Sequence, residues 1–307
     1  MSILNREERQ TLRSVQMHLY TSILRAQAVH EQIGTVDVYF HASNPAPHLN
    51  CVIPHKGVAW IRHADLRAAF MGLERLGRIP RLLILDALFP DAFKQQLTLM
   101  ELTTEDERLV MVYQPMQGPD LPEETPRGRL PHTFGPSIQP MLATTPAELA
   151  TWLRIFRAGY YNTEALSIEP GAIDPLRAGI ETGEFAFVIA NYETTPLGAA
   201  RVSLRPPTAE LEAVVTTPLW HGMGLEEALI TTGTQAALER NCEIVFTIAP
   251  SDEYTRLYRR LGFVELTHMT TYWRADDYAQ ALGRITNTAP KGADNDVAEP
   301  VHPHSGQ

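Results

Sequence analysis

The segment from Glu210 to Phe263, ELEAVVTTPLWHGMGLEEALITTGTQAALERNCEIVFTIAPSDEYTRLYRRLGF, carries most of the fold information in this 307-residue chain. It opens with a run rich in β-branched residues, which is typical of a strand, and continues into the glycine-containing loop His221–Gly224. Leucines and isoleucines at helical spacing then predict a helix to about Arg240. A strand at Ile244–Ile248 and a helix from Ser251 to Leu261 follow. The segment therefore predicts an α/β unit in the order strand, loop, helix, strand, helix.

The two glycines of the loop, Gly222 and Gly224, stand where the first of these helices begins. Glycine lets backbone N–H groups approach an anion closely, and a helix N-terminus contributes about half a positive charge. This arrangement suits a pyrophosphate. A simple tight turn would also explain the two glycines, so the loop alone does not decide the function.

Upstream of this segment the sequence predicts more of the same unit. Glu184–Tyr192, Gly198–Leu204 and Glu210–Thr216 are separated by short turns and predict an antiparallel meander. An apolar segment at Ile138–Leu142 precedes them, and Thr145–Glu148 has the pattern of a capping box at the start of a helix.

The first 114 residues predict a related arrangement. A helical stripe of apolar residues from Leu12 to Leu24 is followed by the predicted strands Val36–Phe40, Cys51–Ile53, Leu82–Leu85 and Leu109–Tyr113, with helices from Asp65 and after Pro90. A displacement of 161 residues aligns Asp91–Leu102 with Asp252–Phe263, each after an apolar strand. We interpret this as an internal duplication, with a chance likeness of two strand-helix-strand units as the alternative.

Eight prolines between Pro115 and Pro146 predict a boundary between the two halves, because proline removes backbone donors. After Asn287 the sequence is polar and almost free of large apolar residues. We therefore expect a lobe at 1–114, a proline-rich linker at 115–137, a second lobe at 138–286 and a disordered tail at 287–307.

The charge pattern excludes some classes of partner. The formal net charge is −10, of which −7 falls in residues 138–286 and 0 in residues 1–114. Such a chain lacks the general basic surface of a nucleic-acid-binding protein, and its acidic second lobe favours a cationic acceptor. No apolar run is long enough to span a membrane and the N-terminus is charged, so we expect a cytoplasmic protein without a membrane partner.

Metal and disulfide sites are not expected either. Cys51 and Cys242 lie far apart, and the histidines at 41, 48, 55 and 63 have no carboxylate or cysteine pattern around them. We expect both cysteines to be buried as small apolar residues.

The second half resembles the GCN5-related N-acetyltransferase (GNAT) superfamily. The likeness rests on Pro218-Leu-Trp-His221-Gly-Met-Gly224-Leu-Glu226, which matches the family's Gln/Arg-x-x-Gly-x-Gly/Ala loop, and on Tyr258-Arg-Arg-Leu-Gly262-Phe263, which matches a Tyr-x-x-x-Gly-Phe-like pattern. It covers roughly residues 138–274 and extends more loosely to the first lobe as a degenerate copy. The resemblance implies an α/β (α+β) protein of two GNAT-like lobes, each a mixed, mostly antiparallel sheet flanked by helices.

The resemblance also implies a site for acetyl-CoA. A backbone N–H near Val214 or Val215 would polarise the thioester carbonyl, Tyr258 would protonate the departing sulfur, and Glu210 or Glu212 would act as the general base. The cofactor-binding residues that the resemblance implies are Val214, Val215, Thr216, His221, Gly222, Met223, Gly224, Leu225, Glu226, Ser251 and Tyr258. For Tyr258, a packed aromatic without a catalytic role is the alternative, and for the two glutamates a solvated strand face.

Two residues depart from the family pattern. His221 replaces the usual Gln or Arg, and Glu226 replaces the last small residue of the loop. A carboxylate beside a pyrophosphate would be repelled by roughly 1 kcal/mol, unless Glu226 points outward from the first helical turn.

The first lobe has no glycine loop and has Leu97 where the second lobe has Tyr258, so we expect it to be structural or to shape the substrate site. The sequence therefore predicts an acyl-CoA-dependent N-acyltransferase that transfers acetyl from acetyl-CoA to a primary amine of a small molecule or peptide, by direct attack in a ternary complex. A non-catalytic CoA-binding or protein-interaction module on the same fold is the alternative.

Overall fold

The computed structural model describes residues 5–56, 58, 60–114, 137–161, 167–169 and 171–274. The predicted tail at 287–307 and all of the predicted linker except residue 137 lie outside these residues. None of the helices in the described ranges is both long and apolar enough to cross a lipid bilayer.

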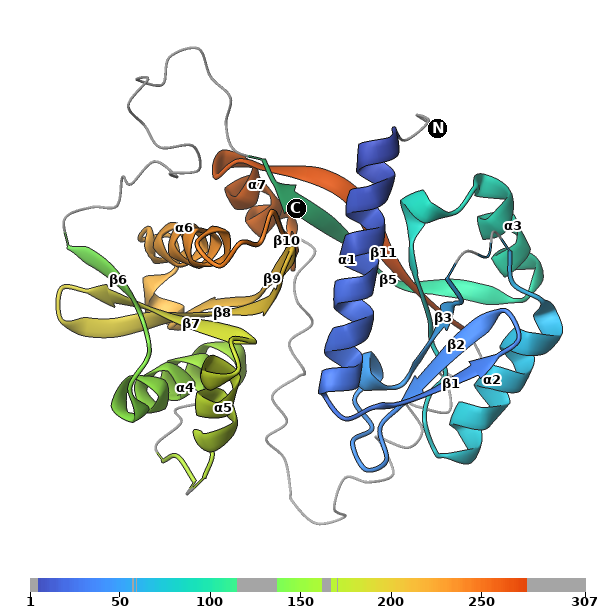
Figure 1. Cartoon of the computed structure of the whole chain (residues 1–307), viewed down its shortest axis with the longest axis horizontal. Helices are drawn as coiled ribbons and strands as arrows, with labels where there is room; N and C mark the ends of the chain where they lie inside the picture. Colours follow the sequence, from blue (N-terminus) through green and yellow to red (C-terminus); the bar gives the residue numbers. More distant parts are fainter. Residues whose placement is uncertain are drawn as a thin grey trace, which may run out of the picture.

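Eleven strands of the described chain form one mixed sheet (Figure 1). Their order across the sheet is β1-β2-β3-β4-β11-β5-β10-β9-β8-β7-β6, and only the pairs β3–β4 and β9–β10 are parallel. The strands are β1 (Val29–Ile33), β2 (Val36–Phe40), β3 (Cys51–Pro54), β4 (Leu82–Leu85), β5 (Leu102–Tyr113), β6 (Ile138–Leu142), β7 (Phe185–Tyr192), β8 (Thr195–Arg205), β9 (Thr208–Thr216), β10 (Ile244–Ile248) and β11 (Phe263–Arg274). The mixed, mostly antiparallel α+β class predicted from the sequence is confirmed.

Seven α-helices of the described chain cover this sheet. They are α1 (Arg6–Arg25), α2 (His63–Arg75), α3 (Asp91–Leu99), α4 (Pro146–Tyr161), α5 (Asp174–Glu181), α6 (Leu225–Leu238) and α7 (Asp252–Arg260). In the second lobe, α6 lies on one face of the strands and α4 and α5 lie on the other (Figure 1). The predicted capping box forms at α4, where Glu148 N–H donates to Thr145 and Thr145 N–H donates back to the Glu148 carboxylate.

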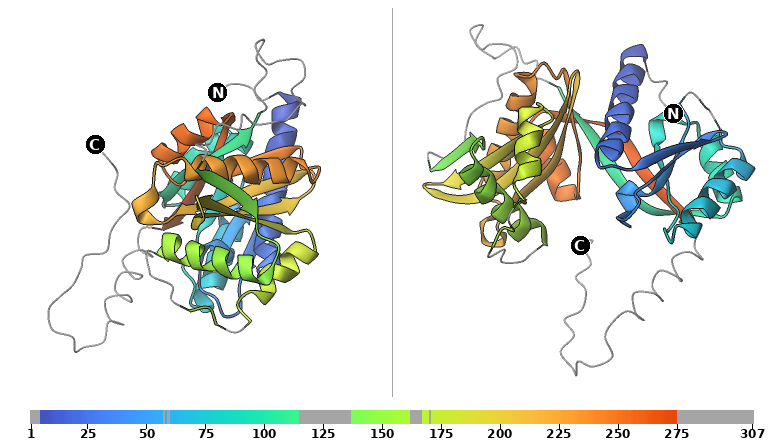
Figure 2. Two further views of the ribbon diagram at one scale, coloured as in Figure 1. Left: turned by 90° about the vertical axis from the view of Figure 1, so that its left-hand side faces the viewer. Right: turned by 60° about the horizontal axis from the view of Figure 1, so that its bottom comes forward.

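The two lobes exchange their last strands. β5 of the first lobe pairs with β10 of the second, β11 of the second lobe pairs with β4 of the first, and β5 and β11 pair with each other. Figures 1 and 2 show these two strands running from one lobe to the other. The sequence predicts one sheet in each lobe, but the structure has a single continuous sheet. The exchange joins the two sheets because each exchanged strand has a hydrogen-bonded neighbour on both edges.

The observed elements repeat at the predicted displacement. The bounds of α3 and α7 differ by 161 residues, and so do those of β5 and β11. In both halves the element order is meander, helix, strand, helix, strand. The structure therefore carries the internal repeat beyond the short aligned segment.

Among the strands and α-helices of the described chain, β1 and α5 were not predicted. β1 reads VHEQI and lies largely exposed at the edge of the sheet, so it lacks the apolar alternation that marks a half-buried strand. α5 has only eight residues, fewer than a periodic pattern needs to stand out.

Helix α1 stands between the lobes and packs against both (Figure 1). Val15 on α1 belongs to a buried cluster with Leu85 of β4, Val110 of β5 and Phe246 of β10. This position brings α1 side chains close to the strands of the second lobe.

Candidate functional site

The parallel strands β9 and β10 pair only at their beginnings and then separate. Pairing covers Thr208–Glu210 of β9 with Ile244–Phe246 of β10, whereas β9 remains paired with β8 as far as Thr216. A β-bulge at Glu212 interrupts the β8–β9 register just beyond the point of separation. The far half of β9 therefore presents one backbone edge to the space between the two strands.

Tyr258 lies at the apex of this separation. Its ring is buried against Phe263, and its hydroxyl hydrogen-bonds to Thr247, the residue that follows the last paired position of β10. The Thr247 hydroxyl in turn donates to the carbonyl of Leu211 on β9, at 2.9 Å. Burial raises the pKa of Tyr258 to about 12, so the phenol stays protonated at neutral pH.

The glycine loop lies at the far end of β9. Gly222 and Gly224 have φ angles of 75° and 88°, which favour glycine, and a Cβ added at Gly222 would meet nothing within 4 Å. Gly224 is the N-cap of α6, and no side chain in the described chain caps this helix. Leu225 is buried in the core beneath, whereas Met223 is half exposed.

Glu226 does not point outward as an exposed first-turn residue would. Only 5% of it is exposed, and its Oε1 accepts a hydrogen bond from the Thr216 hydroxyl at 2.8 Å and lies 3.1 Å from His221 Nδ1. Its Oε2 is buried without a hydrogen-bond partner in the described chain. The outward orientation considered from the sequence is therefore wrong, because Thr216 at the end of β9 draws the carboxylate inward.

The remaining predicted cofactor residues lie along the same space. The carbonyl of Val214 accepts a 3.3 Å hydrogen bond from the hydroxyl of Tyr254, a residue that the sequence analysis did not select. Val215 approaches α4 closely, since a Cβ added at Gly159 would come within 3.0 Å of the Val215 Cβ. Ser251 is the N-cap of α7, and its hydroxyl accepts from the Tyr254 N–H.

Glu210 and Glu212 both line a cavity of about 870 Å³ between the lobes. Glu212 forms an ion pair with Arg201. Three other acid–base pairs line the same cavity: Arg25 with Glu184, Arg81 with Glu105, and Arg108 with Asp106. Glu210 differs, because its carboxylate accepts no hydrogen bond from any described residue. The charges of Glu212 and Arg201 act on it without a direct contact, and its ion-pair contact in the described chain is with a histidine.

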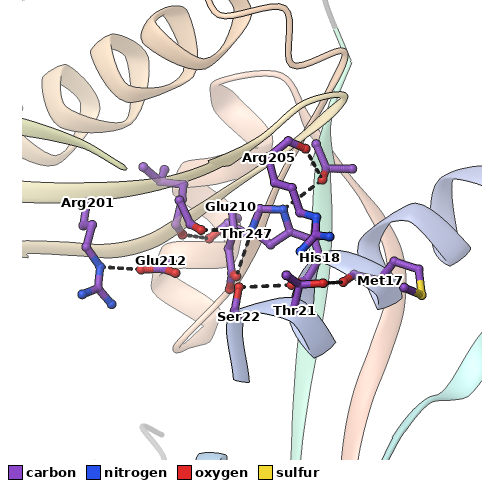
Figure 3. Close-up of polar contacts among 12 residues, drawn as sticks. Met17, His18, Thr21, Ser22, Arg201, Arg205, Glu210, Glu212 and Thr247 are labelled. Atoms are coloured by element: carbon purple, nitrogen blue, oxygen red, sulfur yellow. Dashed lines mark hydrogen bonds and ion pairs between the residues drawn. The ribbon is translucent and has the colours of Figure 1, made fainter. Parts of the chain in front are cut away.

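That histidine is His18, which α1 contributes from the first lobe (Figure 3). Its Nε2 lies 3.9 Å from Glu210 Oε2 and 3.2 Å from the Ser203 hydroxyl, and its Nδ1 lies 2.9 Å from the Thr208 hydroxyl. Burial, followed by the charges of Arg25 and Arg205, lowers the pKa of His18 to about 4. The imidazole is therefore neutral at pH 7 and does not compensate the charge of Glu210.

Burial raises the pKa of Glu210 to about 8, and the nearby charge of Glu212 acts in the same direction. A carboxyl group with this pKa can accept a proton from a cationic amine near neutral pH. The two glutamates thus share one cavity but differ in state: Glu212 is held by Arg201, and Glu210 is free to exchange a proton.

No pattern in the sequence marks His18 or Tyr254 as functional. His18 falls on the buried face of α1 among apolar residues, and its partners lie more than 180 residues away in the chain. Tyr254 is the N3 residue of a short helix, where its side chain direction depends on how α7 packs. Within the described ranges, no group of three or more His, Cys, Asp or Glu side chains is placed to hold a metal ion.

Comparison with known proteins identifies the second lobe. Residues 149–263 match the model of the acetyltransferase (GNAT) family. No curated protein sequence matches the chain.

Among solved structures, the GCN5-related N-acetyltransferase from Kribbella flavida has a TM-score of 0.64 at 14% identity, covering 89% of this chain and 97% of its own. A GCN5-related N-acetyltransferase from Sphaerobacter thermophilus has a TM-score of 0.53 at 12% identity, covering 79% and 81%. A tandem GNAT protein from the clavulanic acid biosynthesis pathway has a TM-score of 0.52 at 13% identity, covering 77% of each chain.

At these identities the solved structures show a common fold, and this likeness extends over most of both lobes. The family match is specific to the segment that contains the glycine loop, the separated strands and Tyr258. Residues 149–263 of this chain are therefore a domain of the acetyltransferase (GNAT) family.

Proposed function

We propose that the protein is an N-acyltransferase that moves an acetyl group from acetyl-CoA to a primary amine bound in the cavity between the lobes. The observation that carries the proposal is Glu210, a buried carboxyl group with a pKa near 8 at the apex of the separated strands. Both lobes contribute residues to the cavity around Glu210. The first lobe, which lacks a glycine loop, would therefore serve to shape the substrate site.

The second lobe presents backbone N–H donors that suit coenzyme A. No backbone carbonyl or side chain of the described chain accepts from the N–H groups of Leu225, Glu226 and Glu227, which point from the start of α6. These groups, with the open space at Gly222, would hold the pyrophosphate. The free edge of β9 near Val214 and Val215 would hold the pantetheine arm, and the Tyr254 hydroxyl would leave the Val214 carbonyl to make room.

Glu226 opposes an anion at this loop, whereas Glu227 in the same first turn is paired with Arg260. The charge of Glu226 is partly offset by the N-terminus of α6 and by contact with His221, whose ring is more than half exposed. If His221 is protonated, the His221–Glu226 pair has no net charge and does not repel the phosphates. We therefore expect binding that is weakened rather than abolished.

When bound, coenzyme A would supply an acetyl thioester. Glu210 would take a proton from the ammonium form of the substrate, which leaves the nitrogen lone pair free to attack. A backbone N–H of β9 would stabilise the negative charge that develops on the carbonyl oxygen. The Tyr258 hydroxyl would protonate the departing sulfur, and the second proton that the nitrogen loses on becoming an amide would return to the Tyr258 phenolate. The amide and the free thiol then both leave neutral, and one proton remains on Glu210.

Two measurements test the proposal. Calorimetry with acetyl-CoA on the full chain should give a saturable heat, and thiol release should then be detected with one or more members of a panel of primary amines. The absence of heat at high micromolar acetyl-CoA would refute the cofactor assignment. Binding without thiol release over a broad panel would replace the enzyme with a non-catalytic CoA-binding module.

A further inference from the structure

A second hollow lies next to His18, on the side away from Glu210. Its volume is about 350 Å³, within the range of small-molecule sites. Its walls come from α1, from the segment Pro54–Lys56 after β3, from Leu88–Phe89 after β4, and from the turn Arg205–Thr208 between β8 and β9. Both lobes therefore contribute to it, as they do to the larger cavity.

The charge of this hollow is the opposite of the protein's net charge. Arg13, Lys56 and Arg205 line it, and none of the described residues that line it is Asp or Glu. No ion pair joins any of these three cations to a described residue, whereas the arginines of the larger cavity are each paired with a carboxylate. His55, on the wall, is held by Asp37 at 3.0 Å. The cations of this pocket thus have no internal counter-charge.

Arg205 gives the most specific indication of a ligand. Its Nη1 atom is buried and has no hydrogen-bond partner in the described chain. Burial and the charge of Arg25 lower the pKa of the guanidinium, and Arg205 lies beside His18 (Figure 3). A buried, unpartnered donor on a charged group is costly, and an oxyanion in the pocket would satisfy it once the guanidinium turns toward the pocket.

The basic surface continues along α1. Arg6, Arg9 and Arg13 share one face of this helix at spacings of three and four residues. With Gln10 they line an adjoining depression of about 420 Å³, and Gln10 and Arg13 belong to both hollows. A ligand with more than one anionic group could therefore contact both.

We propose that this pocket, formed by Arg13, Lys56, Arg205 and the adjoining face of α1, binds a small organic phosphate. The guanidinium of Arg205 contacts one phosphate group from the inside of the pocket. Arg13 and Lys56 contact it from the rim, and Arg6 and Arg9 hold a second anionic group. The site is separate from the glycine loop, and its existence does not depend on acetyl transfer.

The test is calorimetric titration of the full chain with pyrophosphate at fixed ionic strength. Arg205→Gln and Lys56→Gln should each weaken binding at least tenfold, and Lys56, being exposed, can be changed without disturbing the core. Arg67→Gln, on an exposed arginine of α2, is the matched control and should bind as the wild type does. A loss of pyrophosphate affinity in Arg205→Gln and Lys56→Gln, which leave the glycine loop intact, assigns the binding to this pocket.

Two results would overturn the proposal. One is unchanged affinity in both Arg205→Gln and Lys56→Gln. The other is tighter binding of a different class of ligand than of pyrophosphate. If citrate binds more tightly, the pocket's ligand is a carboxylate, and if a short single-stranded oligonucleotide binds more tightly, it is a nucleic acid. Tighter binding of pyrophosphate than of both supports the assignment.

Discussion

Replacing Glu210 with Gln removes the one cavity carboxylate that has neither a hydrogen bond nor an ion pair with a cation in the described chain, and it changes the shape of the side chain very little. The substitution mimics the protonated acid, which is the state that burial favours. It should therefore affect activity and stability in opposite directions.

The magnitude follows from the pKa. Folding raises it from 4.5 to about 8, so the folded protein holds the proton more tightly than the unfolded chain between these values. The free energy of unfolding of the wild type should therefore fall as pH rises through this window. The full difference corresponds to at most about 5 kcal/mol, and an effective dielectric above that of a dry interior reduces it. We expect Glu210→Gln to be more stable than the wild type by about 2 kcal/mol or more at pH 8.5, with little difference at pH 4.

Activity should change in the other sense. Loss of a general base typically costs about 10²–10⁴-fold in rate, so Glu210→Gln should lower kcat/KM by that factor. The wild-type rate should rise with pH and reach half of its plateau near pH 8. Urea unfolding at several pH values and thiol release across pH 6–9 measure the two effects, with Glu243→Gln, an exposed glutamate, as the control.

A substitution of Glu212 tests the same site independently. Its negative charge helps to raise the pKa of Glu210. Glu212→Gln should consequently shift the pH–rate profile to lower pH while leaving catalysis in place. Glu210 is not the general base if Glu210→Gln alters neither the pH slope of stability nor the rate, or if Glu212→Gln abolishes the rate and Glu210→Gln does not.

Three further predictions follow from the surrounding groups. Tyr258→Phe should lower kcat by about tenfold or more with little change in the binding of acetyl-CoA, whereas Tyr113→Phe, in the same aromatic cluster, should leave kcat unchanged. His18 has a folded pKa of about 4 against 6.5 unfolded, so the wild type should lose up to about 3 kcal/mol of stability between pH 6.5 and 4; unfolding curves of His18→Gln should lack this part of the loss. Glu226→Gln keeps an acceptor for the Thr216 hydroxyl and removes the buried charge, so calorimetry should show acetyl-CoA binding about fivefold tighter; weaker binding would mean that the carboxylate holds His221 for the phosphates.

The local elements could be predicted because they depend on neighbours in the sequence. The capping box of Thr145 and Glu148, the strand Ile244–Ile248 and the glycine loop before α6 all result from periodicity or from short-range hydrogen bonds. The repeat at 161 residues is likewise visible from the residues themselves. The candidate site was accessible to the same degree: the sequence selected Tyr258, Glu210 and the loop, because each belongs to a recognisable pattern.

The states of those residues required the tertiary structure. Glu210 and Glu212 look alike in the sequence, and only the packing of α1 and the position of Arg201 distinguish a buried, protonatable group from an ion-paired one. The sequence is compatible with a Glu226 side chain that points outward or inward, and only its hydrogen bond with Thr216 in the folded chain decides for the inward orientation. A regional charge of zero in the first lobe also concealed the cations on α1 that form no ion pair within the described part of the chain, because a sum does not say which charges meet.

The sequence by itself thus determined the order of most strands and helices, but not β1 or α5. It also determined the repeat and the family pattern. All of these rest on interactions between residues close in the chain. Tertiary structure alone decided the exchange of β5 and β11, the approach of His18 to Glu210, and the convergence of Arg13, Lys56 and Arg205 on one pocket. His18 and Glu210, for example, are 192 positions apart in the chain. Burial and proximity, which fix pKa values and uncompensated charge, arise only when the chain is folded.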